Sequence, residues 1–295
     1  GLHYGIAIFE GMKAHRSLKG DEVAIFRLKD HYERFLKSAK RMLMPPVPET
    51  HFVYGMIELV RKVKEYIPTG KGNSLYIRPF MFSIDPMIRI QFPGKFLFSI
   101  IASPSGAYYS KPVSLRIETQ FVRACRGGTG NIKCGGNYGA SIYPHYLAVQ
   151  DGFDQVLWTD AHSHKYIEEV GTMNIFVRFR DEIATPSLDT ETILPGITRD
   201  SVIQILKFRG INVNERPISV DELVSAAENN SLIEIFGTGT AATITPVSSF
   251  SYKGRVFKLR TEGEDLLAPQ LKETLDNIKH GIDVPENFKH WLTIV

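Results

Sequence analysis

Lys133 is the residue whose type and setting most directly predict chemistry. It lies in residues 127–138, a segment that contains five glycines. Glycine lets the backbone approach a ligand closely and adopt positive φ angles. An amine that is partly removed from water in such a segment loses its proton more readily and becomes a nucleophile. The segment therefore predicts a reactive lysine, and it leaves a solvated loop lysine as the alternative.

Residues 194–200 have the features of an anion-binding turn. A Pro-Gly pair leads directly into a predicted helix, so the amides of Ile197 and Thr198 would point outward at its positive end. A phosphate fits at such a helix end. The alternative is an ordinary turn in which Thr198 caps the helix.

Residues 237–242 follow a predicted strand and match the dinucleotide-binding pattern G-x-G-x-x-A. The next residues, 243–247, are mostly β-branched and include a proline, so no helix can begin where a pyrophosphate would need one. We therefore reject a dinucleotide site. The segment is interpreted as a loop between two strands, whose small residues and amides suit a single phosphate or a carboxylate.

Charged residues adjoin apolar, strand-like segments at two places. Glu168 and Glu169 precede one such segment, and a buried acid needs a cationic or hydrogen-bonding partner. Paired surface glutamates are the alternative. Arg78 lies within another such segment, where it is either a surface residue of an edge strand or a clamp for a carboxylate.

Composition excludes several classes of function. The 295 residues, 43% of them hydrophobic, favour two domains, and the net charge of +3 argues against nucleic acid as a partner. Two cysteines and nine histidines without ligand spacing predict no metal site, and so few cysteines fit a reducing cytoplasm. No apolar run reaches the length of a membrane span, and the first residues carry no secretion signal. We expect a soluble, cytoplasmic protein that makes no membrane contact.

The periodicity of apolar residues predicts the elements that must position these groups. Helical spacing indicates helices over 28–43 and 50–67, and aliphatic and aromatic runs indicate strands over 74–82 and 96–102. The turn residues between the two strands predict an irregular functional loop over 84–94. Small and turn-forming residues from 103 predict a linker over 103–112, which divides an N-terminal domain, 1–102, from a C-terminal domain, 113–295.

Strands and helices alternate in the predicted C-terminal domain, which indicates an α/β or α+β fold. The predicted strands are 113–122, 155–158, 172–179 and 231–236, and the predicted helices are 138–150, 198–209 and 219–228, the last capped by Ser219.

Taken together, these segments resemble the branched-chain amino acid aminotransferases, which are pyridoxal 5′-phosphate (PLP) enzymes of fold type IV. The resemblance runs nearly end to end and rests on eight motifs in the family's order. These are residues 2–5, 9–13, 26–27 with 31–34, 76–79, 133–138, 169–174, 194–199 and 239–242. The resemblance implies a two-domain α/β (α+β) fold with the cofactor site at the domain interface.

The resemblance also implies how PLP is held. Lys133 would form the internal aldimine and later move a proton between the substrate α-carbon and the cofactor. Glu169 would pair with the pyridine nitrogen, and Tyr138 with the phenolic oxygen. The phosphate would be held by Arg34, the amides of Ile197 and Thr198, and the hydroxyl of Thr240.

The implied substrates are the branched-chain L-amino acids leucine, isoleucine and valine, together with 2-oxoglutarate and glutamate. One pocket must therefore accept both an apolar side chain and a carboxylate. The implied substrate contacts are Tyr4, Phe9 and Tyr76 as an apolar wall, Arg78 for the distal carboxylate, Thr172, and the amides of Ala241 and Ala242 for the α-carboxylate.

The family's loop that corresponds to residues 84–94 closes over the pocket of a partner subunit, which implies a homodimer or a higher homo-oligomer. The chain departs from the family pattern in three ways, one of which is that the loop over 84–94 diverges in sequence and is short. The chain also starts at a motif that normally follows an N-terminal strand pair, so we expect that Gly1 is not the natural start. Ala242 and Thr245 stand where the mammalian enzymes carry a redox-sensing cysteine pair, so we expect no such switch.

Three alternatives remain open. The D-amino acid aminotransferases and the aminodeoxychorismate lyases share the fold, the lysine and the phosphate contacts, although residues 76–78 and 171–174 favour the branched-chain group. A protein that only binds a phosphate-bearing ligand, with Lys133 paired to the anion, belongs to a different class of function.

Overall fold

The computed structural model describes residues 1–86, 88–106 and 111–295. The chain forms two compact units. The first contains Gly1–Tyr108, Ile132–Gly136 and Glu273–Val295, and the second contains Tyr109–Asn131 and Asn137–Lys272. The chain therefore enters the first unit three times, and the short middle segment carries Lys133.

The first unit is built on a six-stranded sheet in the order β1-β4-β2-β3-β15, with β5 also paired to β4. Its strands are β1 Ala7–Phe9, β2 Met12–Arg16, β3 Val23–Phe26, β4 Ser74–Ser83, β5 Phe96–Ser105 and β15 Leu292–Ile294. Strands β1 and β2 pair with successive stretches of β4, Phe9 with Phe80 and Met12 with Ile77. The two residues between them, Glu10 and Gly11, interrupt the pairing where β4 carries Arg78 and Pro79.

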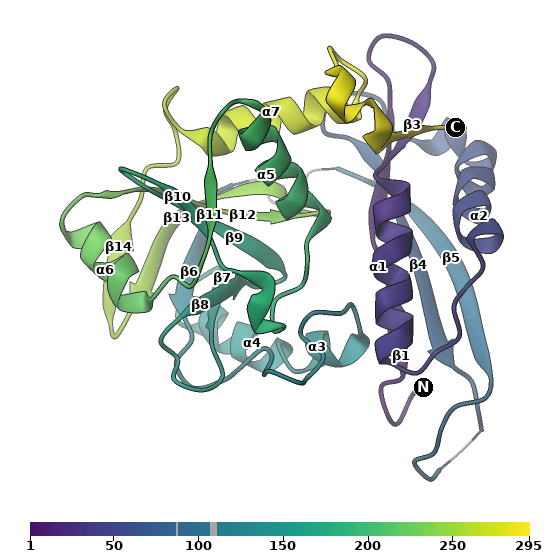
Figure 1. Cartoon of the computed structure of the whole chain (residues 1–295), viewed down its shortest axis with the longest axis horizontal. Coiled ribbons are helices and arrows are strands. Elements are labelled where there is room, and N and C mark those ends of the chain that lie inside the picture. Colours follow the sequence, from purple (N-terminus) through teal and green to yellow (C-terminus); the bar gives the residue numbers. More distant parts are fainter. Residues whose placement is uncertain (87, 107–110) are drawn as a thin grey trace. The chain divides into compact units, whose positions relative to one another are not determined.

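Two helices, α1 Leu28–Arg41 and α2 Glu49–Lys62, pack on this sheet (Figure 1). The predicted helix over 28–43 is confirmed to within two residues. The predicted helix over 50–67 ends earlier than expected, and a 3-10 turn, η1 Lys64–Tyr66, follows it. The rings of Phe35, Phe52 and Phe98 meet in the core, with centroids 5.1 to 5.9 Å apart. Aromatic contacts of this kind contribute beyond their buried area.

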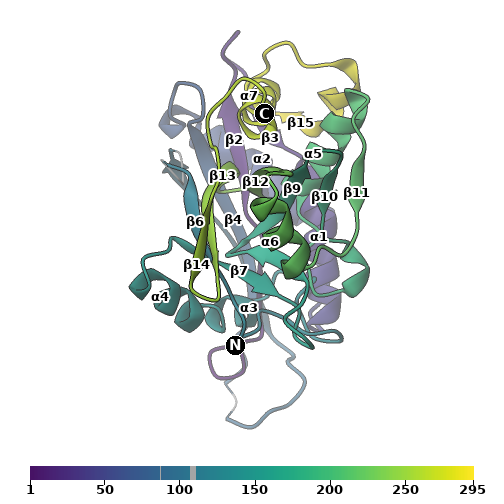
Figure 2. The same cartoon turned by 90° about the vertical axis from the view of Figure 1, so that its left-hand side faces the viewer.

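The second unit is built on a nine-stranded sheet in the order β11-β10-β9-β12-β13-β6-β7-β8, with β14 paired to β13 and β8 also paired to β9 (Figure 2). The strands are β6 Val113–Ile117, β7 Gln155–Thr159, β8 Ile167–Val170, β9 Met173–Phe179, β10 Ile183–Thr185, β11 Val213–Glu215, β12 Leu232–Gly239, β13 Thr243–Tyr252 and β14 Arg255–Lys258. Parallel and antiparallel pairs occur together, so the α/β class that the sequence predicts is confirmed.

The remaining helices are α3 Gly135–Gly139, α4 Ile142–Gln150, α5 Ile197–Phe208, α6 Val220–Glu228 and α7 Leu267–Lys279, with 3-10 turns η2 Leu188–Thr190 and η3 Glu286–Trp291. The prediction that Ser219 caps α6 is confirmed, because the Ser219 side chain and Glu222 form a reciprocal capping box. The helix predicted over 138–150 is confirmed as α4 from Ile142 onward, but residues 140 and 141 form a turn that separates it from α3. Pro144 has no amide hydrogen to give to the preceding turn, so the chain breaks between α3 and α4.

Other boundaries differ from the predictions for local reasons. The strand predicted over 113–122 ends at Ile117, because the Glu118 carboxylate accepts hydrogen bonds from the amides of Thr119, Gln120 and Phe121 and turns the chain. The predicted linker, 103–112, begins inside β5, and its residues 107–110 lie outside the described residues. The segments 132–136 and 273–295, assigned from sequence to the C-terminal domain, belong to the first unit.

No helix in the described ranges is long and apolar enough to cross a membrane. Within the same ranges, no group of three or more His, Cys, Asp or Glu side chains could hold a metal ion.

A cluster of buried basic groups lies in the first unit between the sheet and α7. His15 is almost fully buried, its ring lies 5.0 Å from that of His280, and its Nδ1 is 3.2 Å from the carbonyl of Asn73. Burial, together with the charges of Lys279, His280 and Lys13, lowers the pKa of His15 well below its ordinary value of 6.5. His15 is therefore neutral in the folded chain.

This burial makes the stability of the chain depend on pH. Below pH 6.5 the unfolded chain binds a proton at His15 that the folded chain does not, so His15 lowers the free energy of unfolding as the pH decreases. Above pH 6.5 His15 is neutral in both states and makes no pH-dependent contribution. We expect that the loss of unfolding free energy between pH 7.5 and 5.5 is about 1 kcal/mol smaller in His15→Gln than in the parent chain. Denaturant unfolding at the two pH values measures this difference. His51→Gln, which removes an exposed histidine, is the control, and equal losses in all three chains would contradict the expectation.

Candidate functional site

Lys133 is held by two elements of the first unit. Its carbonyl accepts a hydrogen bond of 3.1 Å from the amide of Phe9, and its amide donates one of 3.0 Å to the hydroxyl of Ser38 on α1. The next residue, Cys134, forms a β-bridge with Ile8. The segment therefore extends the β1 edge, and the backbone of Lys133 is fixed on both sides.

The face of α1 that carries Ser38 also carries His31 and Arg34, because residues three and four apart share one side of a helix. Both side chains meet the carboxylate of Glu10, which is fully buried. Arg34 binds it with two hydrogen bonds of 2.6 and 2.9 Å, and Nδ1 of His31 lies 2.8 Å from it. This is the paired-fork geometry that makes arginine–carboxylate contacts strong.

The charges of this cluster shift the pKa values of its members. Burial raises the pKa of Glu10, but the charge and hydrogen bonds of Arg34 outweigh it with help from His31, so the pKa lies far below its ordinary value. Glu10 is therefore ionised at neutral pH. Burial lowers the pKa of His31 despite its hydrogen bond to Glu10.

Lys133 has the lowered basicity that its sequence setting predicts. Burial, with the nearby charge of Arg34, lowers its pKa from 10.5 to about 8, although Glu10 acts in the opposite direction. Its Nζ lies 4.9 Å from the centre of the Phe9 ring. A substantial share of this amine is thus neutral near physiological pH, and a neutral amine is a nucleophile.

Phe9, Tyr76 and Arg78, predicted from sequence as substrate contacts, lie together in the first unit. The guanidinium carbon of Arg78 is 4.6 Å from the centre of the Phe9 ring and 5.2 Å from that of Tyr76. Arg78 also donates a 2.8 Å hydrogen bond to the Tyr76 hydroxyl. Its buried Nε has no hydrogen-bond partner among the described residues. An apolar wall with a cation at its edge is thus present, and the assigned substrate role stays a prediction.

Tyr4, the third residue of the predicted wall, lies at a different part of the first unit. Its hydroxyl donates to the carbonyl of Ile88, and the residue is 41% exposed. It lines a hollow with Ile84 and Pro86 from the predicted loop. Within that loop, the Asp85 carboxylate accepts hydrogen bonds from the amides of Gly94 and Lys95.

In the second unit, Glu169 lies on β8 opposite Asn174 on β9. One oxygen of its buried carboxylate accepts a 2.7 Å hydrogen bond from the amide of Leu194, and the other lies 3.3 Å from Nε of Arg123. Arg123 also donates to the carbonyls of Gly130 and Thr192. Glu169 is therefore a buried acid with a cationic and a hydrogen-bonding partner, which excludes the alternative of a surface glutamate.

Asn174 connects this acid to the predicted anion turn. Its amide donates a 2.8 Å hydrogen bond to the carbonyl of Leu194, and a Cβ at Gly196 would overlap its side-chain oxygen. Helix α5 begins at Ile197 with Gly196 as the N-cap residue and no side-chain cap. The alternative in which Thr198 is the N-cap is therefore wrong, because Thr198 lies one residue inside the helix. An uncapped helix start is the arrangement that an anion can complete.

Residues 237–242, the second segment rich in small residues, contain the end of β12 and a tight turn, and β12 pairs with β9, the strand that carries Asn174. Strands β12 and β13 pair up to Gly239 and Thr243, which leaves Thr240, Ala241 and Ala242 as a three-residue hairpin loop. The rejection of a dinucleotide site is confirmed, because a strand and not a helix follows. Thr238 pairs with Asn174 in the neighbouring strand, and its buried hydroxyl has no hydrogen-bond partner among the described residues.

The β8–β9 turn completes this edge of the sheet. It contains Gly171, with φ of 53°, and the exposed Thr172, whose carbonyl lies 3.9 Å from a Cβ built at Gly239. The structure thus gathers Glu169, Thr172, Ile197, Thr198, Thr240, Ala241 and Ala242 along the ends of β8, β9 and β12. Tyr138 lies on α3, where its carbonyl accepts from the amide and hydroxyl of Ser141.

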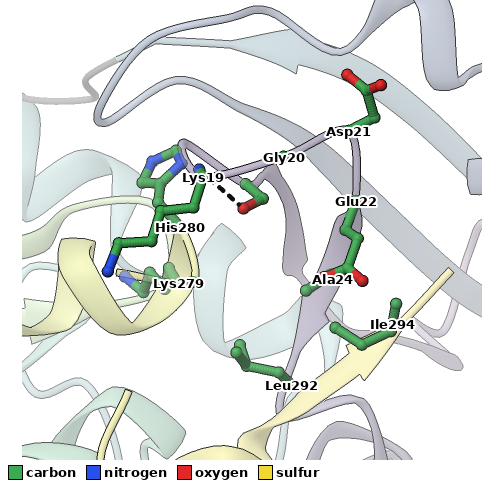
Figure 3. A pocket seen from close by; sticks show the side chains of 11 residues that line it. Lys19, Gly20, Asp21, Glu22, Ala24, Lys279, His280, Leu292 and Ile294 are labelled. Atoms are coloured by element: carbon green, nitrogen blue, oxygen red, sulfur yellow. Dashed lines mark hydrogen bonds between the residues drawn. The ribbon is translucent and has the colours of Figure 1, made fainter. Parts of the chain in front are cut away.

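A separate hollow in the first unit gathers none of the predicted residues (Figure 3). It lies between the turn that joins β2 to β3, the end of α7 and β15. Its buried imidazole, His280, uses both ring nitrogens, one with the carbonyl of Arg16 and one with the amide of Gly72. The imidazole in this hollow is therefore satisfied by the fold.

Four functional candidates gained no role from sequence: Glu10, His31, Arg123 and Asn174. A signal for Glu10 existed, since a charge between the apolar residues of β1 and β2 predicts a buried partner. No such signal identified its partners, because Arg34 and His31 lie more than twenty residues along the chain.

Comparison with known proteins identifies the family of this chain. Residues 7–250 match the family model for amino-transferase class IV. The chain belongs to the class IV aminotransferases. Branched-chain-amino-acid aminotransferase 2 of Bacillus subtilis is 42% identical over 282 residues, which cover 95% of this chain and 77% of that protein.

Solved structures of class IV aminotransferases are also similar to this chain. The branched-chain aminotransferase of Thermoproteus uzoniensis with norvaline matches with a TM-score of 0.82 at 30% identity, over 99% of this chain and 91% of that one. The T.th. branched-chain amino acid aminotransferase complexed with N-(5′-phosphopyridoxyl)-L-glutamate matches with a TM-score of 0.83 at 31% identity, over 99% and 90%. The fold type IV architecture that the resemblance implies is thereby confirmed.

The lowered pKa of Lys133 generates a direct test. We expect the rate at which the apo chain captures PLP to rise with pH and to level off above a midpoint of about 8, because only the neutral amine reacts. Stopped-flow absorbance after mixing with the aldehyde measures this rate. A midpoint near 10.5, the ordinary lysine value, would contradict the assigned environment.

Proposed function

We propose that this chain catalyses PLP-dependent transfer of the amino group between the branched-chain L-amino acids and 2-oxoglutarate, giving branched 2-oxo acids and L-glutamate. The single observation that carries the proposal is the pairing, in one unit, of a weakly basic Lys133 with an apolar wall that ends in Arg78. The names of the relatives support the same substrate class.

PLP fits the polar groups that the fold leaves for a ligand. The start of α5 has no side-chain cap, and the hydroxyl of Thr238 lacks a partner among the described residues. The amides of Ile197 and Thr198, the hydroxyl of Thr240 and the guanidinium of Arg34 would hold its phosphate. Glu169 would pair with its pyridine nitrogen, and Tyr138 would bind its phenolic oxygen. When bound, PLP withdraws electrons from the substrate α-carbon and so makes its proton removable.

The residues of the chain supply the proton transfers and the positioning. Lys133 holds a neutral amine at Nζ, which can accept the proton of the substrate α-carbon and return it at a different atom. One carboxylate oxygen of Glu169 lies 3.3 Å from Nε of Arg123, and the carboxylate would accept a hydrogen bond from a protonated ring nitrogen opposite it. The amides of Ala241 and Ala242, near Thr172, would bind the α-carboxylate that all substrates share.

Substrate selection follows from the wall and its cation. A leucine side chain gains free energy by burying apolar area against Phe9 and Tyr76, which needs no precise geometry. The distal carboxylate of glutamate requires a donor at a defined position, and Arg78 provides it.

The reaction gives the first test of the proposal. We expect L-leucine and 2-oxoglutarate to yield 4-methyl-2-oxopentanoate and glutamate, and Lys133→Ala to lower turnover at least a thousandfold because the general base and the covalent attachment are both lost. A coupled assay of glutamate measures turnover in both chains. Mass spectrometry of the borohydride-reduced protein detects PLP attached to Lys133.

Lys29→Ala, an exposed lysine of α1, is the matched control and should retain full activity. Turnover only of D-alanine, or release of pyruvate from aminodeoxychorismate, would assign the chain to a different activity of the same fold. A chain that binds PLP but incorporates none of it after borohydride treatment would be a phosphate-ligand binder.

We also propose that the chain acts in the cytoplasm as a homodimer or larger homo-oligomer. Both cysteines are free thiols, which is typical of a reducing compartment. Large apolar side chains are exposed at the loop over 84–94 and at the start of the chain, with Leu2 94%, Ile88 90% and Phe92 85% exposed. Apolar groups gathered in this way mark a contact surface.

The assembly has its own test. We expect light scattering to give at least twice the 33.3 kDa of the chain, and the double substitution Ile88→Asp with Phe92→Asp to shift the mass towards the monomer, because buried charges without partners oppose association. Leu18→Asp, in the turn between β2 and β3, is the control and should leave the mass unchanged. A monomeric parent chain would refute the proposed assembly.

A further inference from the structure

Gly11 lies where β1 and β2 join, and the Tyr76 side chain packs directly against it. A Cβ built at Gly11 would overlap the Tyr76 hydroxyl oxygen and would lie 2.8 Å from Cζ of the same ring. Real Cβ atoms essentially never make contacts as short as either of these two. Any residue other than glycine at this position must therefore displace either its own backbone or the Tyr76 ring.

The backbone at Gly11 is fixed on both sides. The amide of Glu10 donates a 2.8 Å hydrogen bond to the carbonyl of Pro79, and Met12 pairs with Ile77 in the sheet. The amide of Gly11 itself donates to the Glu10 carboxylate, which Arg34 holds with its guanidinium. Moving this backbone would disturb a buried ion pair, whereas rotating Tyr76 displaces only the far end of one side chain.

The Tyr76 hydroxyl positions Arg78. It accepts the 2.8 Å hydrogen bond of Arg78 Nη2, and the guanidinium carbon lies 4.6 Å from the centre of the Phe9 ring and 5.2 Å from that of the Tyr76 ring. A long side chain with several rotatable bonds keeps a defined position only while such contacts restrain it. Displacing the hydroxyl would therefore release the guanidinium.

We propose that Gly11 is a specificity-determining residue, whose missing side chain lets Tyr76 hold Arg78 where it receives the distal carboxylate of the dicarboxylate substrate. This inference rests on the proposed function and extends it to a residue that touches no substrate. Gly11 acts through Tyr76 and is a positioning residue.

The two substrate classes should respond differently to a displaced Tyr76. A hydrogen-bonded ion pair between Arg78 and a carboxylate weakens steeply when the geometry is lost. Contact of a branched apolar side chain with Phe9 and Tyr76 is non-directional and changes little when one ring rotates. The result is a split between dicarboxylate and branched-chain substrates, which a general loss of stability would not produce.

The experiment compares Gly11→Ala with Gly20→Ala in the PLP-bound protein. Gly20 lies in the turn between β2 and β3, where an added Cβ meets nothing within 4 Å. We expect Gly11→Ala to raise the KM for 2-oxoglutarate about tenfold, in line with the loss of one charge-assisted hydrogen bond, and to change that for 4-methyl-2-oxopentanoate less than twofold. Calorimetric titration with glutarate and with 4-methylpentanoate should show the same split without turnover. Gly20→Ala should match the parent chain throughout.

A double-mutant cycle tests the path through Tyr76. In Tyr76→Phe the hydroxyl is absent, so adding Gly11→Ala should weaken glutarate binding by much less than it does in the parent chain. Equal losses for both ligands in Gly11→Ala, or additive losses in the cycle, would overturn the inference. A parent chain with no aminotransferase activity would instead refute the proposed function. If the parent chain is active but Gly11→Ala weakens both ligands equally, only this inference is refuted.

Discussion

The buried ion pair between Glu10 and Arg34 is the constraint on which the first unit depends. A carboxylate with no solvent exposure is tolerated only when its charge is matched and its oxygens accept hydrogen bonds. Arg34 and His31 meet both needs from one face of α1. Because loss of one partner from such a pair costs about 3–5 kcal/mol, the contact fixes α1 against the junction of β1 and β2. The same face of α1 supports the amide of Lys133 through Ser38.

In the second unit an uncharged side chain, that of Asn174, fixes the positions of the candidate site residues. Asn174 lies between Glu169 and Thr238 in neighbouring strands and also binds the turn that leads into α5. The acid, the helix start and the hairpin loop are therefore positioned by one rigid edge of a sheet. Groups on turns that rigid strands support can be placed accurately while remaining accessible to a ligand.

Much of this organisation could be predicted from sequence, because it depends on local patterns. Helical periodicity identified α1 and the start of α2, the capping residues identified α6, and the β-branched residues after Gly239 excluded a dinucleotide site. The missed features depend on partners that are distant in the chain or on single side chains. Nothing near Gly11 in sequence predicts that Tyr76 will occupy the space of its side chain, and the end of β6 depends on one carboxylate, that of Glu118.

The placement of Lys133 in the first unit has a consequence for the order of events during folding. Its segment joins the sheet only when Cys134 pairs with Ile8, which precedes it by well over a hundred residues. Until that contact closes, the amine is hydrated and has the basicity of any lysine in an unfolded polypeptide. If Lys133 carries PLP as we propose, capture of this vitamin B6 aldehyde is a late event, and newly made chains that have acquired colour are those whose most distant contacts have already formed.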